Sequence, residues 1–423
     1  KHGEPVTIKY IQTIPKERIA GFVKEIYGSD NKNEYTPFGR ARMNADTVDM
    51  IWTMLTNQYL LIESFAGAAK TSNIVLYAHL IAHDTSEFGK YAFITSREDS
   101  ALSMAERMLL SCYGRVAVDA YGKWGKNKTA TQKINYLRKY LGTYIGTADG
   151  LAWKTVYEFG RLRNKEQQED VNRKINQFDF SKIKNPDIFK EISYAYGEPI
   201  IDYNDARNAA KNIMKSGVVK NIPSNIVMDE AGDISPEIIS FLAEYNKQTS
   251  GKFVAAGDPM QMLSQQGIQP FDMIAKEFSE IAAQRHSNVE LKQYEESGRV
   301  YPPAASAMNI LSGWLNKKIF KGERIPLVNS AKRLSQEPKL LMVRDRSEIK
   351  KVLELSILLS RQEKVTILVS TNKEINDFLK AADQLKIRAF INPVYSKSAK
   401  EISITTKEEA VKAIASVASL SSA

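Results

Sequence analysis

Cysteine and histidine are scarce in this chain of 423 residues, which has one cysteine, Cys112, and four histidines. A single cysteine excludes an internal disulfide, and the histidines lack the Cys/His spacing of a zinc site. His79 and His83 have helical i, i+4 spacing and could ligate a metal, but without a third ligand nearby a helix pair that binds no metal is favoured. This residue usage favours a reducing compartment.

Long apolar runs are also lacking. No segment reaches the ~18 apolar residues that a transmembrane helix needs, and no charged-then-apolar leader stands at Lys1. We therefore expect a cytoplasmic protein without a membrane partner.

The composition that is present is that of a globular, basic protein. Apolar residues make up 43% and charged residues 26% of the chain, and its length predicts two or three domains. The formal net charge of +10 suggests an anionic partner, although charge alone does not identify it.

Short apolar runs alternate with helical segments, a pattern typical of an α/β fold with buried parallel strands. The first group is YLLIES, YAFITS, TYIGT, NIVMDE and KFVAAGD, and the second is VELKQY, KLLMVR, VTILVS and KIRAFI. The pattern predicts two α/β domains: a first at 44–150 and 222–285, and a second, incomplete one at 286–423. Residues 1–43 form an N-terminal extension, and 151–221, where the strand signal disappears, are expected to be a helical insertion.

The segment SFAGAAKTSN, Ser64 to Asn73, lies between a predicted strand and a predicted helix, as a phosphate-binding loop does. In such a loop the lysine reaches the β- and γ-phosphate oxygens and the threonine hydroxyl holds Mg²⁺, roles that Lys70 and Thr71 retain. The full pattern has glycine at positions 64 and 69, where this chain has Ser64 and Ala69. Taken alone, the segment leaves open a nucleotide site or an accident of composition.

Two later segments strengthen the nucleotide interpretation. NIVMDEAGDIS places Asp229 and Glu230 at the end of a β-branched strand, and KFVAAGDPMQM places Gln261 shortly after another. Asp229 could hold a metal, Glu230 could orient or deprotonate water, and Gln261 could contact a γ-phosphate. Each segment alone could be an ordinary strand end. Together, at strand ends where α/β sheets bind ligands, they favour a nucleotide site.

The order of these segments resembles that of the UvrD/Rep/PcrA-like superfamily 1 helicases. FAGAAKTS is similar to the family's AGxGxGKT, DEAGDIS to its DEAQDxS, and AAGDPMQM to its VGDxxQ; YAFITSREDSALSMAERM and YIGTADGL are similar to its segments along single-stranded DNA. The resemblance implies a P-loop NTPase with two RecA-like parallel-sheet domains, ATP and Mg²⁺ as cofactors, and ATP-dependent helicase or translocase activity on single-stranded DNA, with RNA not excluded.

The resemblance also assigns residues. For ATP binding it implies Gly67, Ala68, Ala69, Lys70, Thr71, Ser72 and Tyr294, with Arg299 as a substitute for the family's arginine. Thr71 and Asp229 would hold the metal, and Glu230, Gln261 and Asp229 would act in catalysis. For nucleic acid it implies Thr95, Ser96, Arg97 and Thr147.

A basic stretch, Tyr121 to Gly142, adds Lys126, Lys128 and Lys133 to the candidate nucleic-acid contacts. Its lysines alternate with aromatic residues, which could hold a single strand through charge and stacking. The alternative is an amphipathic helix whose aromatic side packs inward.

Several positions depart from the family pattern. Gly232 stands where a glutamine is expected, Glu295 where an arginine is expected, Asp149 in place of a histidine, and Thr47 near the expected adenine-reading glutamine. The family's late motifs have no match after Val365. These departures favour a second hypothesis, a catalytically degenerate helicase-like scaffold that binds nucleic acid or a protein partner. A packaging-type P-loop ATPase is a third hypothesis, against which the GDPMQ segment and the region around Tyr294 argue.

Overall fold

The computed structural model describes residues 15–27, 46–65, 67–84, 87–220, 222–258, 270–297, 302–315, 317 and 329–330, with four positions between 377 and 384. The chain divides into two compact units, Lys1–Pro338 and Lys339–Ala423. All of the helices and strands described below lie in the first unit.

Six strands form one sheet: β1 (Tyr59–Ser64), β2 (Tyr91–Thr95), β3 (Tyr144–Thr147), β4 (Asn225–Met228), β5 (Phe253–Gly257) and β6 (Val289–Tyr294). Their order is β3-β2-β4-β5-β1-β6, and every pairing is parallel. Parallel neighbours require crossover connections, which place helices on both faces. The predicted α/β class with a parallel sheet is confirmed, and the arrangement is compatible with a RecA-like fold.

The helices are α2 (Lys16–Tyr27), α3 (Thr47–Thr56), α4 (Lys70–Asp84), α5 (Glu98–Gly125), α6 (Ala130–Leu141), α7 (Ala148–Gly160), α8 (Lys165–Asn176), α9 (Pro186–Tyr196), α10 (Tyr203–Ser216), α11 (Pro236–Thr249), α12 (Pro270–Gln284) and α13 (Pro302–Leu315). Two short strands, β7 (Glu296–Ser297) and β8 (Asn329–Ser330), form a separate parallel pair. Among the described residues no helix is both long and apolar enough to cross a membrane.

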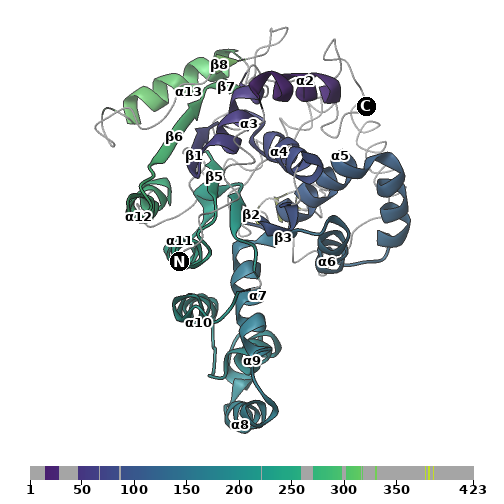
Figure 1. Cartoon of the computed structure of the whole chain (residues 1–423), viewed down its shortest axis with the longest axis vertical. Coiled ribbons are helices and arrows are strands. Elements are labelled where there is room, and N and C mark those ends of the chain that lie inside the picture. Colours follow the sequence, from purple (N-terminus) through teal and green to yellow (C-terminus); the bar gives the residue numbers. More distant parts are fainter. Residues whose placement is uncertain are drawn as a thin grey trace. The chain divides into compact units, whose positions relative to one another are not determined.

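Alternation along the strands produces two hydrophobic cores, one on each face of the sheet. Leu61, Ile94 and Met228 pack on the face covered by α7, α10, α11 and α12. Leu60 and Phe93 point to the opposite face, which α3, α4 and α5 cover. The result is a three-layer unit with the helices arranged around the central strands (Figure 1).

Within the range 151–221, the described residues contain helices and turns and no strand, which is the helical character that the sequence predicts. Local signals start these helices: Asn164 and Gln167 form a capping box before α8, Pro186 begins α9, and the Asp202 side chain caps α10. α7 and α10 contact each other beside the sheet, and α8 and α9 extend away from it (Figure 1).

The first sheet extends further along the chain than the sequence analysis proposes. β6 comes from VELKQY, which we assigned to the second domain, yet it pairs with β1 from Tyr59↔Val289 to Ser64↔Tyr294. Its side chains are largely half-exposed, as befits an edge strand. The boundary at 286 therefore falls before the last strand of the first sheet. The strands expected at KLLMVR, VTILVS and KIRAFI lie outside the described residues.

Candidate functional site

The loop between β1 and α4 retains the backbone conformation of a glycine-containing loop even where glycine is replaced. Gly67 has φ 89°, and Ala69, at the expected second glycine, has φ 61°. The left-handed region costs an alanine about 1–2 kcal/mol. The Ala69 carbonyl then accepts a hydrogen bond from Asn73 N at 2.8 Å, which starts α4. Ala69 thus adopts a left-handed backbone where the motif has glycine, at an energetic cost.

Lys70 begins α4 and folds back over this loop. Its ammonium donates to the carbonyl oxygens of Ser64 at 2.6 Å and Phe65 at 3.0 Å. The residue is half-exposed, whereas Ser64 is fully buried at the end of β1. The Lys70 ammonium is therefore bound to these two carbonyls while its side chain remains partly exposed to solvent.

Thr71 and Asp229 lie together although 158 positions separate them in the chain. The Thr71 hydroxyl donates to Asp229 Oδ2, which joins the start of α4 to the end of β4 across the intervening strand β5. Asp229 is buried. Burial raises the pKa of its carboxyl, while the Thr71 hydrogen bond and the charge of Lys70 act in the opposite direction. The two residues predicted to hold a metal are thus neighbours.

Glu230 turns away from Asp229 toward the segment that follows β2. Its backbone is left-handed, with φ 58°. Its Oε2 accepts hydrogen bonds from the Ser96 hydroxyl at 3.0 Å and from the Ser100 hydroxyl at 3.2 Å. The sequence analysis named Ser96 but missed Ser100, which stands one helical turn further on in α5.

A second contact joins the same two segments. The Arg97 guanidinium lies 3.9 Å from Asp233 Oδ2, with the arginine side chain 61% exposed and the aspartate 21% exposed. Burial raises the pKa of Asp233, and the Arg97 charge lowers it. The candidate nucleic-acid segment therefore contacts the candidate catalytic segment at Glu230 and at Asp233.

Gly232, where the family has a glutamine, lies at a close approach between two loops. A Cβ atom added to Gly232 would lie 3.2 Å from the Asp258 carbonyl oxygen, and one added to Gly257 would lie 3.0 Å from the Gly232 nitrogen. The loops after β4 and β5 therefore pack backbone against backbone. This packing gives a structural reason for glycine at 232.

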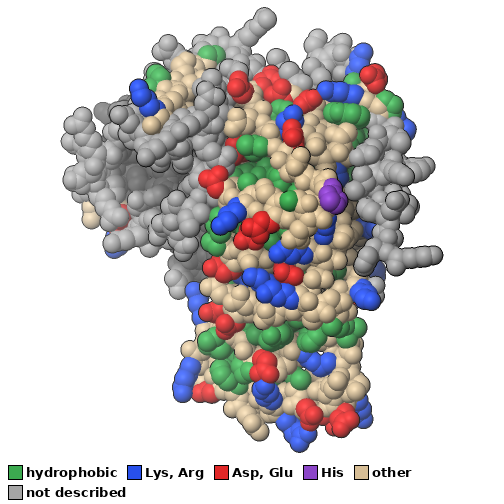
Figure 2. All heavy atoms as spheres, turned by 60° about the vertical axis from the view of Figure 1, so that its left-hand side comes forward, with side chains coloured by type: hydrophobic (Ala, Val, Ile, Leu, Met, Phe, Trp, Pro, Cys, Tyr) green, Lys and Arg blue, Asp and Glu red, His purple; other side chains and the backbone are tan. Residues whose placement is uncertain are grey.

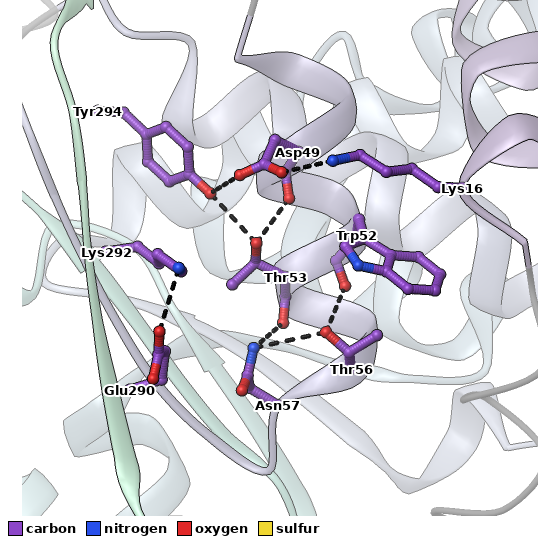
Figure 3. A network of polar contacts seen from close by, with 9 residues as sticks. All are labelled: Lys16, Asp49, Trp52, Thr53, Thr56, Asn57, Glu290, Lys292 and Tyr294. Atoms are coloured by element: carbon purple, nitrogen blue, oxygen red, sulfur yellow. Dashed lines mark hydrogen bonds and ion pairs between the residues drawn. The ribbon is translucent and has the colours of Figure 1, made fainter.

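Tyr294 ends β6 with its hydroxyl directed at α3. The hydroxyl donates to Asp49 Oδ2 at 3.1 Å and lies 3.3 Å from Thr53 Oγ1 (Figure 3). Asp49 also pairs with Lys16 of α2 at 2.7 Å. Burial raises the pKa of Tyr294. The side chain predicted to bind nucleotide thus ties the edge strand to α3. Thr47, which stands near the expected adenine-reading position, is buried at the start of that helix.

The predicted nucleic-acid contacts divide into structural and exposed residues. Thr95 is buried and donates to the Arg97 carbonyl at 2.7 Å, and the Thr147 hydroxyl caps α7 by accepting from Gly150 N at 3.0 Å. Ser96 is half-exposed and contacts Glu230, and Arg97 is exposed. Of Thr95, Ser96 and Arg97, only Ser96 and Arg97 are therefore open to solvent.

The helical hairpin of α5 and α6 carries an aromatic row at its surface. Trp124 and Tyr136 stack with ring centroids 4.2 Å apart, and Tyr136 and Tyr140 continue the row at 6.1 Å. Trp124 is 36% and Tyr140 45% exposed, while Tyr121 is buried. The alternative of an aromatic side that packs inward therefore holds for Tyr121 but not for Trp124 and Tyr140.

One lysine lies beside this row, and two more belong to the same stretch of the chain. Lys126 and Lys128 are exposed, Lys133 is half-exposed, and the Lys128 ammonium lies 5.8 Å from the Trp124 ring centroid. By contrast, Figure 2 shows basic and acidic side chains interspersed over the described part of the face that it brings forward. A row of rings with lysines in the same stretch of the chain is suited to a polyanion with stacking groups.

Two remaining groups noted in the sequence have structural partners. Asp149 forms a bidentate ion pair with Arg207, at 2.7 and 3.1 Å, which joins α7 to α10. His79 Nδ1 lies 2.8 Å from Ser111 Oγ, and His83 Nε2 lies 3.2 Å from the Cys112 carbonyl. The described residues contain no group of three or more His, Cys, Asp or Glu side chains placed to hold a metal ion.

Gln261 and Arg299 lie outside the described residues. No protein-family model matches this chain, and no curated protein has a significantly similar sequence.

Proposed function

We propose that this chain binds MgATP and couples its hydrolysis to binding or movement on single-stranded DNA, in the manner of a UvrD-like superfamily 1 helicase or translocase. The observation that carries the proposal is the hydrogen bond between Thr71 and Asp229. It joins the lysine-threonine loop after β1 to the carboxylate pair after β4 at one edge of a parallel sheet, where α/β proteins bind ligands.

In this proposal Lys70 is the phosphate ligand. Its acceptors include the carbonyls of Ser64 and Phe65, and a nucleotide's phosphate oxygens are stronger acceptors because they are charged. The backbone N–H groups of Gly67, Ala69 and Ser72 contribute the rest of the cradle at the start of α4, and that of Ala68 would first have to leave the Phe65 carbonyl, to which it donates at 3.2 Å.

The donor set of Thr71 and Asp229 fits Mg²⁺. The pair offers one hydroxyl and one carboxylate, and Mg²⁺ commonly takes one or two protein oxygens, with the others from phosphates and water. A bound Mg²⁺ would neutralise charge on the β- and γ-phosphates. To act as ligands, the Thr71 hydroxyl and the buried Asp229 carboxylate would replace the hydrogen bond between them with bonds to the metal.

Glu230 is the proposed base. As water oxygen bonds to the γ-phosphorus, the bond from that phosphorus to the β,γ-bridging oxygen breaks, ADP leaves, and the water proton passes to the Glu230 carboxylate. Gln261 and Arg299 remain proposed γ-phosphate contacts. Because Glu295 stands at the family's arginine position, we expect slow turnover.

Single-stranded nucleic acid is proposed to contact the exposed Arg97 and the α5–α6 hairpin. Lys126, Lys128 and Lys133 supply phosphate contacts, and the exposed rings of Trp124 and Tyr140 supply stacking surfaces for bases. These contacts carry little base preference and admit RNA as well as DNA.

A second candidate is a degenerate scaffold that binds nucleic acid or a protein partner and hydrolyses no ATP. The left-handed Ala69 favours it, because strain in the loop lowers the free energy available for nucleotide binding.

Titration of a fluorescent ATP analogue with Mg²⁺ into wild type, Lys70→Ala and Lys165→Ala tests whether the loop binds nucleotide, and the hydrolysis rate of wild type then separates the two candidates. Lys165 is exposed on α8 and controls for the loss of one positive charge. We expect Lys70→Ala to weaken binding tenfold or more, an effect of about 1.4 kcal/mol, and Lys165→Ala to leave it unchanged. Equal affinity in all three proteins would mean that the loop is vestigial.

A further inference from the structure

We propose that Ser96 and Ser100 form a latch that holds Glu230 in a resting position and that a nucleic-acid phosphate releases it. This inference rests on the proposed function and concerns the regulation of the same site. Neither serine has a role in hydrolysis in the proposal above, and Ser100 was not a candidate residue.

The latch is defined by two hydrogen bonds to one carboxylate oxygen. Both serine hydroxyls donate to Glu230 Oε2, at 3.0 and 3.2 Å, so the carboxylate is held from the side of the β2–α5 segment. Asp229, directly before it, instead receives the Thr71 hydroxyl. The two adjacent carboxylates are thus directed to different partners, one toward the phosphate loop and the other away from it.

The backbone at Glu230 is consistent with a held conformation. Its left-handed φ of 58° is unfavourable for a residue with a side chain, and the Glu230 N–H donates to Asp229 Oδ1 at 3.0 Å. Surrounding contacts must compensate for this conformation. The two serine hydroxyls, which donate to a charged acceptor, are suited to do so.

Nucleic acid would compete for the same donors. Ser96 is half-exposed and stands next to Arg97, whose exposed guanidinium lies 3.9 Å from Asp233. A phosphate that binds Arg97 and accepts the Ser96 hydroxyl would remove a donor from Glu230 and weaken the ion pair with Asp233. Glu230 would then be free to turn toward the attacking water, so hydrolysis would depend on an occupied nucleic-acid site.

If the serines only position Glu230 for catalysis, the change in hydrolysis rate on removing them has the opposite sign. If the two hydroxyls hold Glu230 in its working orientation, their removal lowers the hydrolysis rate. If they hold it at rest, their removal raises the rate in the absence of nucleic acid.

The test is ATP hydrolysis by the full chain with Ser96→Ala and Ser100→Ala combined, measured with and without an oligothymidylate. We expect the rate without oligonucleotide to rise about fivefold or more and the stimulation by oligonucleotide to disappear. Ser96→Thr with Ser100→Thr keeps both hydroxyls and should retain the low rate. Ser103→Ala, an exposed serine on the same helix, is the matched control. A lower or unchanged rate in the double alanine variant overturns the proposal.

Oligonucleotide affinity gives a second readout that does not depend on hydrolysis. Because Glu230 and phosphate compete for Ser96, Glu230→Ala should bind a fluorescent oligothymidylate several-fold more tightly than Asp99→Ala, which removes one exposed negative charge nearby. Equal affinities in these two variants contradict the latch.

Failure of the latch and failure of the proposed function give different results. If wild type binds the ATP analogue but the double alanine variant is no faster, only the latch is wrong. If wild type does not bind the analogue at all, the proposed function is wrong and the latch with it.

Discussion

Two lysines near opposite ends of neighbouring strands, β1 and β5, both donate hydrogen bonds to backbone carbonyls. Lys70, after β1, donates to two backbone carbonyls at 2.6 and 3.0 Å. Lys252, directly before β5, donates to the carbonyls of Met54, Leu55 and Asn57 at 2.5, 2.9 and 2.5 Å. Lys70 is half-exposed and Lys252 is buried.

The difference lies in the acceptors and in access to solvent. Lys252 satisfies carbonyls at the end of α3, where a helix leaves its last C=O groups without intrahelical donors. Lys70 binds the carbonyls of Ser64, the last residue of β1, and Phe65, and its own side chain is half-exposed, so that water can compete for the ammonium. The type of hydrogen bond does not distinguish the proposed phosphate ligand from a structural lysine. The two lysines differ in their positions along the strands and in their exposure to solvent.

The largest effect should come from removing the buried lysine. Lys252→Met keeps most of the side-chain volume but removes the amine whose two N–H groups, at pH 9, serve the carbonyls of Met54, Leu55 and Asn57, so we expect a loss of about 3 kcal/mol in the free energy of unfolding at that pH. Urea unfolding measures it, with the exposed Lys276→Met as control. A loss no larger than in the control would mean that the two lysines are equally dispensable to the fold.

The next effect is a pH dependence confined to Lys252. Burial lowers its pKa from 10.5 to about 7. Between these values the unfolded chain binds a proton that the folded chain does not, so the free energy of unfolding rises with pH, by up to about 1.4 kcal/mol per unit. From pH 7.5 to 9 we expect wild type to gain about 2 kcal/mol relative to Lys252→Met in urea unfolding. Parallel pH profiles would show that the three carbonyls keep the ammonium charged.

A set of three lysines on the α5–α6 hairpin, two exposed and one half-exposed, extends the comparison. Replacing Lys126, Lys128 and Lys133 by alanine should weaken single-stranded DNA binding about tenfold and reduce the log-log salt slope by about 2, with all sequences affected alike. Fluorescence anisotropy at several salt concentrations measures both. A triple variant of Lys165, Lys184 and Lys190, on the insertion, is the control. An unchanged slope would show that this surface does not follow the phosphate backbone and would redirect the search to protein partners.

The smallest effect should be that of replacing Lys70 on the free energy of unfolding. Lys70→Met should change the free energy of unfolding by less than about 1 kcal/mol, because Lys70 is half-exposed and has two carbonyl acceptors, whereas Lys252 is buried and has three. Urea unfolding beside Lys252→Met tests this directly. A loss as large as that of Lys252→Met would make Lys70 a structural residue.

The sequence predicted the strands well because buried parallel strands appear as short apolar runs. YLLIES, YAFITS and NIVMDE coincide with β1, β2 and β4. The partner of β6 was not predictable in the same way, because an apolar run does not specify which strand it joins. Pairing with β1 is instead fixed by contacts such as that between Tyr294 and α3.

The candidate site was also predictable only in part. The neighbourhood of Thr71 and Asp229 follows from motif order, since both lie at carboxyl ends of parallel strands. The contact of Ser100 with Glu230 accompanies a left-handed backbone at Glu230. The sequence gives no sign of that conformation, because the residue is not a glycine. Lys252 was missed because a lysine before a strand is usually solvent-exposed.

The position of β1 in the sheet bears on how the protein is made. Its two neighbours are β5 and β6, which follow it by about 190 and 225 residues in the chain. At a synthesis rate of roughly 5–20 residues per second, YLLIES leaves the ribosome about 10–40 s before its first partner strand exists. During that interval six residues destined for complete burial have no sheet to join. We therefore expect the strand that leads into the loop before α4 to benefit from protection by a chaperone during synthesis.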